Sequence, residues 1–180
     1  MFTGIVQHRG QVATIEDRPE CRRIVVDAVG WSHVPDRGDS IAINGCCLTV
    51  AEQPAGGLLA FDAIPQTLDV TTLSGLALGS TVNLEHAVTP ATLLGGHLVQ
   101  GHVDGIAEVV RSVDDGEQRR IGFRPPANLM PCMVDKGAVA LDGVSLTLAE
   151  VDHDTIEVAL IPTTLELTTL GDLAIGDAVN

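Results

Sequence analysis

Hydrophobic and polar positions alternate over short stretches of the chain, and turn-forming residues separate these stretches. Runs rich in β-branched and other apolar residues occupy positions 23–28, 40–43, 48–52, 81–85, 106–110, 138–141 and 155–160. Glycine, proline, aspartate and asparagine lie between the runs, which is typical of a small antiparallel barrel or sandwich. Two weakly helical stretches, 66–72 and 164–170, each follow an Ile-Pro pair, and proline is common in a first helical turn.

The chain contains an internal repeat. Residues 41–52 (IAINGCCLTVAE) and 139–150 (VALDGVSLTLAE) are identical at 6 of 12 positions, and residues 64–83 and 161–180 are identical at 12 of 20. We therefore expect two related modules, 1–96 and 97–180, joined by a linker that carries Pro90, Gly95 and Gly96. The second module ends inside the segment that matches 81–87, so we expect its last strand residues to be missing.

The composition is that of an acidic globular protein. Asp plus Glu number 24 and Lys plus Arg number 10, a net charge of −14 that argues against binding nucleic acid or an anionic membrane surface. No apolar run is long enough for a transmembrane helix, and the N-terminus does not resemble a secretory signal. The four cysteines lack C-x-x-C spacing, so we expect reduced thiols in the cytoplasm; they are Cys21, Cys46, Cys47 and Cys132.

Twin polar pairs are the first candidates for chemistry. Cys47 and Thr49 are alternate residues, as are Ser145 and Thr147 in the matching segment, so each pair would share one face of a strand. A nucleophilic or hydrogen-bonding group would then lie beside a threonine hydroxyl in each module. The alternative is the ordinary polar outer face of a half-buried strand.

Other candidates distinguish the two modules. His102 aligns with Ile5 and is a candidate general base, or else a structural histidine. Its spacing from His97 places the two imidazoles on opposite faces of a strand, and no cluster with metal-ligand spacing completes a site. Lys136 aligns with Gly38 and is a candidate ligand contact or a solvated turn residue. Two similar pockets with unlike side chains could hold two copies of one molecule and treat them differently.

Glycines and helix starts recur at matching positions. Gly4 and Gly101 open the two modules, and glycine in strand-like sequence permits close approach of a ligand or another backbone. The Ile-Pro junctions after 63 and 160 would present free N–H groups to ligand oxygens, or would be plain helix starts.

Five strings in order, MFTGIV, GDSIAINGCCLTV, GGHLVQGHVDG, LDGVSLTL and IPTTLELTTLG, resemble the riboflavin synthase family, in which the lumazine-binding unit is duplicated. The resemblance implies an all-β fold of two tandem six-stranded Greek-key barrels with short helices. It implies dismutation of two 6,7-dimethyl-8-ribityllumazine molecules to riboflavin and 5-amino-6-(ribitylamino)uracil, without a metal or redox cofactor. It also implies a homotrimer built by a C-terminal helix, with each active site between the first barrel of one subunit and the second barrel of its neighbour. That helix is expected to be missing here, so the oligomeric state of this chain stays open.

The resemblance also carries site residues. Phe2 would lie near the bound ring. The first pocket would use Gly4, Ile5, Val6, Cys47, Leu48, Thr49, Asp62, Ala63, Ile64, Pro65, Gln66 and Thr67. The second would use Gly101, His102, Val103, Lys136, Ser145, Leu146, Thr147, Ile161, Pro162, Thr163, Thr164, Leu165 and Glu166.

The same resemblance suggests catalytic roles. His102, Ser145 and Thr147 would remove a proton from an acidic methyl group of one lumazine and stabilise the carbanion. Cys47 would polarise or add to the other molecule, or position a water that does.

Two other functions stay open. A non-catalytic relative that only binds lumazine or flavin needs the pockets but not His102, Cys47 and Ser145 together. A duplicated β-barrel with an interaction role explains the repeat but not the twin polar pairs.

Overall fold

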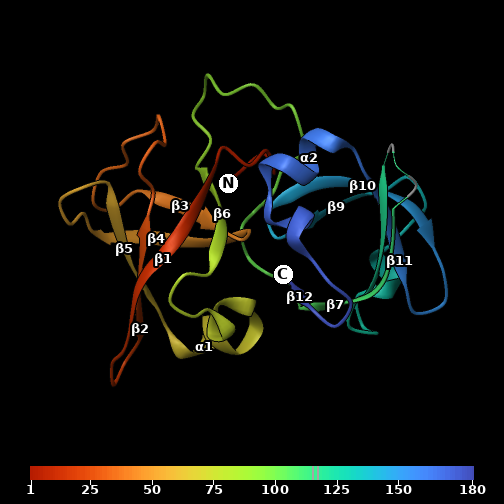
Figure 1. The fold of residues 1–180 in the computed structure, drawn as a ribbon, viewed down its shortest axis with the longest axis horizontal. Coiled ribbons are helices and arrows are strands. Elements are labelled where there is room, and N and C mark those ends of the chain that lie inside the picture. Colours follow the sequence, from red (N-terminus) through yellow and green to blue (C-terminus); the bar gives the residue numbers. More distant parts are fainter. Residues whose placement is uncertain (115, 117) are drawn as a thin grey trace.

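The computed structural model describes residues 1–114, 116 and 118–180, and its strands form two antiparallel sheets side by side (Figure 1). Each sheet has six strands, which confirms the expected all-β fold with two barrel-like units and short helices. None of the helices in this described part of the chain is long and apolar enough to cross a membrane.

The first sheet is a closed barrel. Its strands are β1 (His8–Asp17), β2 (Arg22–Asp27), β3 (Ser40–Ile43), β4 (Cys46–Glu52), β5 (Leu58–Ala63) and β6 (Thr81–His86). Their order around the barrel is β1-β2-β5-β4-β3-β6, a Greek-key order, and β6 closes it by pairing with both β1 and β3. Ile24, Phe61 and Leu84 are fully buried inside, because inward residues alternate with outward ones along each strand.

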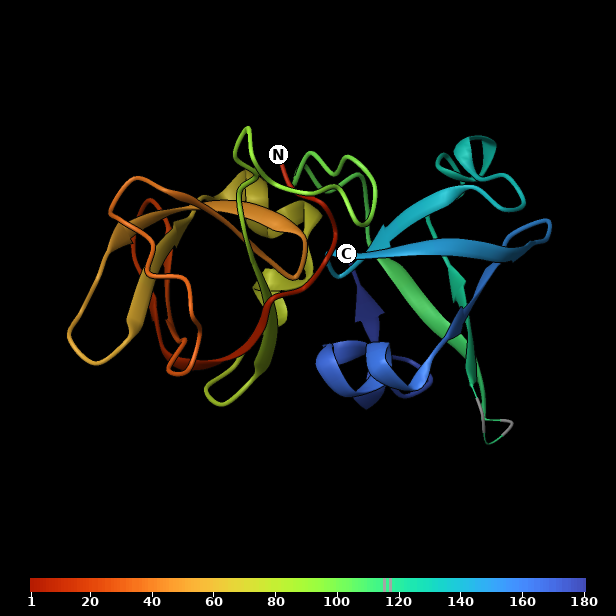
Figure 2. The same cartoon turned by 90° about the horizontal axis from the view of Figure 1, so that it is seen from above.

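The second sheet repeats this topology. Its strands are β7 (Ala107–Asp114), β8 (Arg119–Arg124), β9 (Ala138–Leu141), β10 (Val144–Val151), β11 (Ile156–Leu160) and β12 (Ala178–Val179). The order β12-β7-β8-β11-β10-β9 matches that of the first sheet, strand for strand. β12 has two residues and pairs with β7, so β9 and β12 are the two edges of an open, strongly curved sheet (Figure 2).

Short helices follow the fifth strand of each unit. They are α1 (Pro65–Val70) with the 3₁₀ turn η1 (Thr72–Gly75), and α2 (Pro162–Leu167) with η3 (Thr169–Asp172); η2 (Met130–Cys132) lies in the loop before β9. Both expected helices are confirmed, and each begins at its proline. Thr71 and Thr168 end them in the same way, because each hydroxyl donates to a carbonyl one turn back, 2.7 Å away in both cases.

The expected runs omit five strands, β1, β5, β8, β10 and β12, although β10 contains the pair Ser145 and Thr147 that was expected to lie on a strand. Three of the five have sequences that do not favour a strand. β1 carries mainly polar residues, β5 reads Leu-Leu-Ala-Phe-Asp-Ala without a β-branched residue, and β8 contains three arginines. Pairing with neighbouring strands, not local preference, decides these segments.

The opening segments of the two units are exchanged. Phe2 and Val99 form an antiparallel bridge, with N···O distances of 2.7 and 3.0 Å in the two directions. Val6 packs against the core of the second unit, and Val103 packs against the core of the first. Since the residues of each pair occupy equivalent places in the repeat, the two units are related by an approximate twofold axis through the Phe2–Val99 bridge.

A second contact on this axis joins the hairpin turns between β3 and β4 and between β9 and β10. A Cβ atom on Gly45 would lie 2.7 Å from the backbone nitrogen of Gly143, and the reverse distance is also 2.7 Å. The Asn83 amide donates to the carbonyl of Asp142 at 2.9 Å, and the Asn180 amide donates to the carbonyl of Asn44 at 2.8 Å. Asn44 and Asp142 are therefore twin residues in one buried interface.

Asp142 differs from its twin Asn44 because its side chain can ionise. Its carboxylate accepts the Asn180 N–H at 2.8 Å, as the Asn44 side chain accepts the Asn83 N–H at 2.7 Å. Burial raises the pKa of Asp142 from 3.8 to about 7, and the Asn180 N–H opposes this only in part. The folded protein therefore holds this proton more tightly than the unfolded chain does. The resulting stability is present below about pH 4 and is lost as the pH rises through 7.

We predict that Asp142→Asn stabilises the protein at pH 8, by about 2–4 kcal/mol, because asparagine fills the twin position without a buried charge. Urea unfolding between pH 5.5 and 8.5 measures this, and the gain should shrink toward pH 5.5. Asp69→Asn on the exposed face of α1 is the control and should change little. An equal effect of Asp142→Asn at both ends of the pH range would contradict the assignment.

Candidate active site

The twin polar pairs lie on the outer faces of β4 and β10. Leu48 points into the first core and is 6% exposed, whereas Cys47 is half-buried and Thr49 is exposed. In β10, Ser145 is half-buried and Thr147 is exposed. We call the β4 surface around Cys47 and Thr49 the cysteine face, and the β10 surface around Ser145 and Thr147 the serine face.

Each face is crossed by the opening segment of the other unit. The Cys47 N–H donates to the carbonyl of Gly101 at 2.9 Å, and the Ser145 N–H donates to the carbonyl of Gly4 at 2.7 Å. Both glycines have positive φ, and a Cβ on Gly101 or Gly4 would lie 2.7 Å from the Cβ of Cys47 or Ser145. The close approach that the sequence predicted at these glycines is therefore to a neighbouring strand.

The expected division of pocket residues is wrong for the opening segments. Gly4, Ile5 and Val6 lie against the second unit, and Gly101, His102 and Val103 lie against the first. The physical reason is the segment exchange at the twofold axis. Alignment of the repeats pairs Gly4 with Gly101 but cannot reveal which barrel each one covers.

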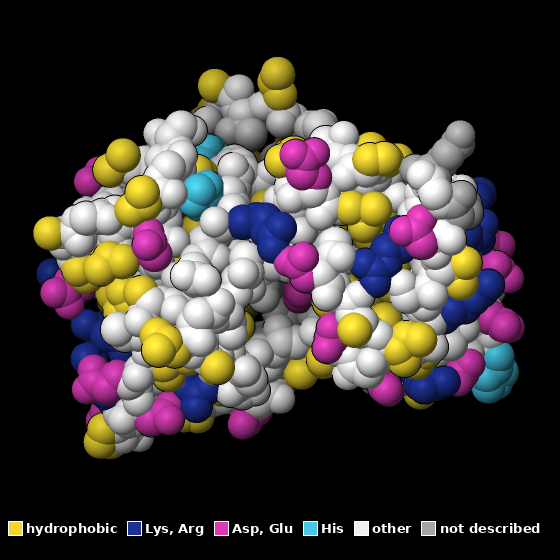
Figure 3. Space-filling model, viewed as in Figure 1, with side chains coloured by type: hydrophobic (Ala, Val, Ile, Leu, Met, Phe, Trp, Pro, Cys, Tyr) yellow, Lys and Arg dark blue, Asp and Glu magenta, His cyan; other side chains and the backbone are white. Residues whose placement is uncertain are grey.

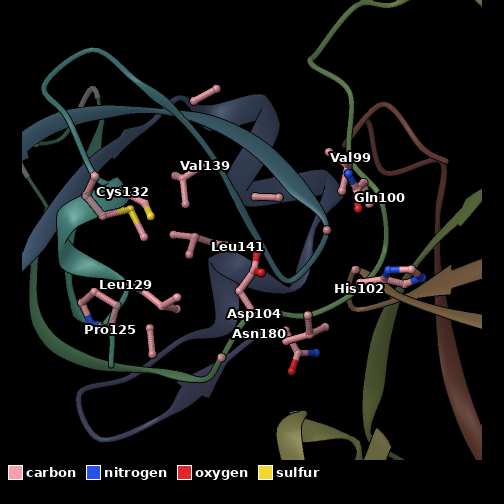
Figure 4. Close-up of a pocket in the computed structure, with 18 of the residues that line it drawn as sticks. Val99, Gln100, His102, Asp104, Pro125, Leu129, Cys132, Val139, Leu141 and Asn180 are labelled. Atoms are coloured by element: carbon pink, nitrogen blue, oxygen red, sulfur yellow. The ribbon is translucent and has the colours of Figure 1, made fainter. Parts of the chain in front are cut away.

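His102 is consequently separated from Ser145. Its side chain is exposed and points away from the second sheet toward the strands of the first barrel (Figure 4). Because the Gly101 carbonyl is held by Cys47, the His102 imidazole belongs with the cysteine face. Within one chain, His102, Ser145 and Thr147 do not form a single group.

The histidine that meets Ser145 is His97. Its Nδ1 lies 2.7 Å from the Ser145 hydroxyl oxygen, and its backbone N–H donates to the Thr3 carbonyl at 3.1 Å. Burial lowers the pKa of His97, which favours the neutral imidazole. The sequence pattern led us to consider His97 only as a metal ligand and not as a partner of Ser145, although the Gly-Gly before it was a signal. A Cβ on Gly96 would lie 2.2 Å from the Thr3 carbonyl oxygen, so only glycine fits there.

Lys136 occupies a strained backbone position beside the serine face. Its φ is +64°, and its N–H donates to the Leu148 carbonyl at 3.1 Å, just as that of Gly38, with φ +99°, donates to Val50 at 2.9 Å. A left-handed conformation costs a residue with a Cβ about 1 kcal/mol. The chain therefore places its only lysine where the twin module has glycine.

Phe2 and Asp62 are committed to structural contacts. Phe2 is fully buried, and a Cβ on Gly101 would lie 2.7 Å from its ring, so the ring packs directly against Gly101. The Asp62 carboxylate accepts two hydrogen bonds from Arg23, at 2.8 and 2.7 Å, and this guanidinium lowers the pKa of Asp62. Phe2 is therefore buried in the fold, whereas Asp62 is held by Arg23 and keeps about one-third of its side chain exposed.

The remaining predicted residues flank the two faces. β5 lies next to β4 and ends at Ala63, so the segment Ile64, Pro65, Gln66 and Thr67 begins beside the cysteine face. In the second unit, β11 lies next to β10, which carries Leu146. The segment that follows β11 therefore begins beside the serine face, and it contains Ile161, Pro162, Thr163, Thr164, Leu165 and Glu166. Neither helix has a side-chain cap at its start.

None of the cavities in the described part of the chain is lined by Cys47, Thr49, Ser145 or Thr147, but one is lined by His97, which contacts Ser145, and by Gly101, His102 and Val103. A cavity of about 450 Å³ opens beside the edge strand β9, and Val139, Leu141, Leu129 and Cys132 point into it (Figure 4). A second of about 390 Å³ lies between the barrels and is lined by Asn44, Asp142 and Thr72, among others (Figure 3). Cys47 and Ser145 are half-buried beside the opening segments and line neither of these two cavities. Among the described residues, no group of three His, Cys, Asp or Glu side chains could hold a metal ion.

Comparison with known proteins identifies relatives over the whole chain. The sequence profile described as the lumazine binding domain matches residues 3–87 and 100–180. Proteins named riboflavin synthase from Mycobacterium tuberculosis and Escherichia coli are each 41% identical to this chain. Both alignments cover 100% of the chain, and they cover 91% and 85% of the respective relatives.

Solved structures with the same fold carry ligands. LumP complexed with riboflavin superposes with a TM-score of 0.88 at 28% identity, and LumP complexed with 6,7-dimethyl-8-(1'-D-ribityl) lumazine superposes with 0.86 at 27%. Each comparison covers 100% of this chain and 97% of the other.

We predict that Lys136→Gly raises the free energy of unfolding by about 0.5–1 kcal/mol, because it relieves the positive φ. The reverse change at the twin position, Gly38→Lys, should lower it by a similar amount. Thermal or urea unfolding of both variants is the measurement. Destabilisation by Lys136→Gly would show that the lysine side chain, and not its backbone strain, dominates at this turn.

Proposed function

The chain belongs to the lumazine-binding domain family, and we propose that it is an enzyme that catalyses the riboflavin synthase reaction. Two molecules of 6,7-dimethyl-8-ribityllumazine react, one donating a four-carbon unit and the other accepting it. The products are riboflavin and 5-amino-6-(ribitylamino)uracil. The observation that carries the proposal is 41% identity to riboflavin synthases over the full chain, together with twin reactive faces that differ at the positions of Cys47 and Ser145.

Each face would hold one of the two substrate molecules. Cys47, Thr49, His102 and Val103 would contact one molecule, and Ser145, Thr147, Lys136 and the segment from Gly4 to Val6 would contact the other. Since the substrates are identical, only the unlike side chains of the two faces can assign them different roles. Stacking two molecules in one site supplies much of the rate enhancement through proximity.

The His97–Ser145 pair supplies a route for a proton. A methyl group conjugated with the lumazine ring is acidic because the charge of its carbanion is delocalised. Neutral His97 can accept the Ser145 hydroxyl proton while that oxygen takes a proton from the methyl group. The imidazolium that forms returns the proton later in the reaction, and Thr147 hydrogen-bonds the charged molecule. Cys47 and His102 would polarise the second molecule or position a water beside it.

Binding would rest on short polar groups and backbone. The chain has three phenylalanines, one tryptophan and no tyrosine, and Phe2 is buried. The pyrimidine edge would therefore be read by backbone N–H and C=O groups near 63–67 and 161–166. Threonine hydroxyls and the Lys136 ammonium would hold the ribityl chains. No cofactor takes part in the proposed reaction.

Assembly and location belong to the same proposal. We assign residues 1–96 and 97–180 to two lumazine-binding modules, and we propose a homotrimer in which the cysteine face of one subunit meets the serine face of the next. A cytoplasmic location is supported by four cysteines that are all free. The partners are the small-molecule substrate and product, and the net charge of −14 disfavours nucleic acid or a membrane.

A binding protein without activity is the second candidate, because structural neighbours named LumP hold lumazine and riboflavin. Such a protein needs no His97–Ser145 pair, and here the two groups are 2.7 Å apart. Retention of that pair favours the enzyme.

Incubation with 6,7-dimethyl-8-ribityllumazine tests the proposal, and we expect riboflavin and the pyrimidine product in equal amounts. Ser145→Ala and His102→Gln should lower turnover by about tenfold or more and should weaken lumazine binding less, because both act in the reaction. His153→Gln, in the exposed turn between β10 and β11, is the control and should keep full turnover. Tight binding of lumazine without product would support the binding protein, and unchanged turnover in both variants would remove the assigned roles.

A further inference from the structure

Glu85 is a buried carboxylate that none of the assigned roles uses. It lies near the end of β6 and is 3% exposed. Both Glu85 and Cys47 stand opposite Ala42 in the strand registers, so Glu85 belongs to the same row of outward side chains as Cys47. Burying a carboxylate is unfavourable unless hydrogen bonds compensate it.

Three donor groups hydrogen-bond the Glu85 carboxylate, and all three belong to Thr3 and Gly4 in the opening segment of the chain. The Thr3 N–H donates to one carboxylate oxygen at 2.6 Å, and the Thr3 hydroxyl donates to the same oxygen at 2.7 Å. The Gly4 N–H donates to the other oxygen at 3.0 Å. Gly4 has φ +73°, and a left-handed residue allows successive N–H groups to converge on one anion. The carboxylate thus fixes both the position and the turn of this segment.

The same two residues support the reactive pair of the serine face. The Gly4 carbonyl accepts the Ser145 N–H at 2.7 Å, and the Thr3 carbonyl accepts the His97 N–H at 3.1 Å. Ser145 is also confined between Gly4 and Gly96, because a Cβ on either glycine would lie within 2.9 Å of the Ser145 Cβ. A shift of Thr3 and Gly4 would therefore move the Ser145 hydroxyl and the His97 imidazole relative to each other.

We propose that Glu85 is a positioning residue for the His97–Ser145 pair and acts on it through Thr3 and Gly4. This inference rests on the proposed function, because it gives that pair its role in turnover. A carboxylate on the first barrel then sets the geometry of the reactive group on the second. Displacement of reacting groups by about 1 Å can lower a rate by up to about a hundredfold, so a small loosening of the segment is enough.

The test compares Glu85→Gln with Glu157→Gln in the full chain. Glu157 is also a buried glutamate on a strand, 6% exposed, but it pairs with Arg111 and Arg120 on the outside of β11. Both variants lose a buried carboxylate, whereas only Glu85→Gln places an amide N–H against the N–H donors of the opening segment. Amide hydrogen exchange at Gly4 and Ser145, lumazine turnover and thermal stability are measured for each.

We expect Glu85→Gln to lower kcat for lumazine by about tenfold or more and to speed exchange at Gly4 and Ser145. Glu157→Gln should keep kcat within about twofold, even if both variants lose similar thermal stability. Equal kcat values in the two variants would overturn the inference. Absence of riboflavin formation by the unsubstituted protein would instead overturn the proposed function.

Thr3→Val provides a second measurement if Glu85→Gln fails to fold. It removes one hydroxyl donor from the carboxylate and leaves the Thr3 and Gly4 N–H groups in place. We expect a smaller fall in kcat in the same direction and faster exchange at Gly4, with Thr3→Ser restoring both. Full kcat in Thr3→Val together with faster exchange would show that the hydrogen bonds between Glu85 and the opening segment serve only the fold, and would contradict the proposal.

Discussion

Exchange of the opening segments across the approximate twofold axis is the contact on which the rest of this molecule depends. A bridge between Phe2 and Val99 lies on the axis, and from it each segment runs over the barrel of the other unit. Hydrogen bonds from Ser145 to Gly4 and from Cys47 to Gly101 fix the register. Since both glycines meet a strand where a Cβ would not fit, the contact specifies glycine at these positions and nothing larger.

Because of this exchange, residues of both units contribute to each polar face. His102 comes from the second unit and lies beside the cysteine face of the first. Thr3 and Gly4 come from the first unit, and their carbonyls accept the N–H groups of His97 and Ser145 at the serine face. Neither barrel alone would carry a complete set of groups. The two faces are interleaved, because the opening segment of each unit hydrogen-bonds a strand of the other unit.

Two of the differences between twin residues lie beside the serine face and on the axis. Lys136 stands at a positive φ where its twin is Gly38, and Asp142 stands in the buried interface where its twin is Asn44. Twin positions in the strands and helix ends keep the same role, as Thr71 and Thr168 do. Symmetric contacts therefore hold the fold, and asymmetric ones make the two faces chemically unequal.

The sequence by itself determined the duplication, the all-β class, the two helix starts and the outward pairs Cys47–Thr49 and Ser145–Thr147. Each of these follows from local alternation or from identity at a fixed offset, which the order of residues contains directly. Only the tertiary structure decided that His97, and not His102, meets Ser145, and that Phe2 and Asp62 are engaged in the fold. The reason is that the opening segments Gly-Ile-Val and Gly-His-Val suit either barrel locally, so long-range packing at the axis, which no local pattern contains, selects the partner of each.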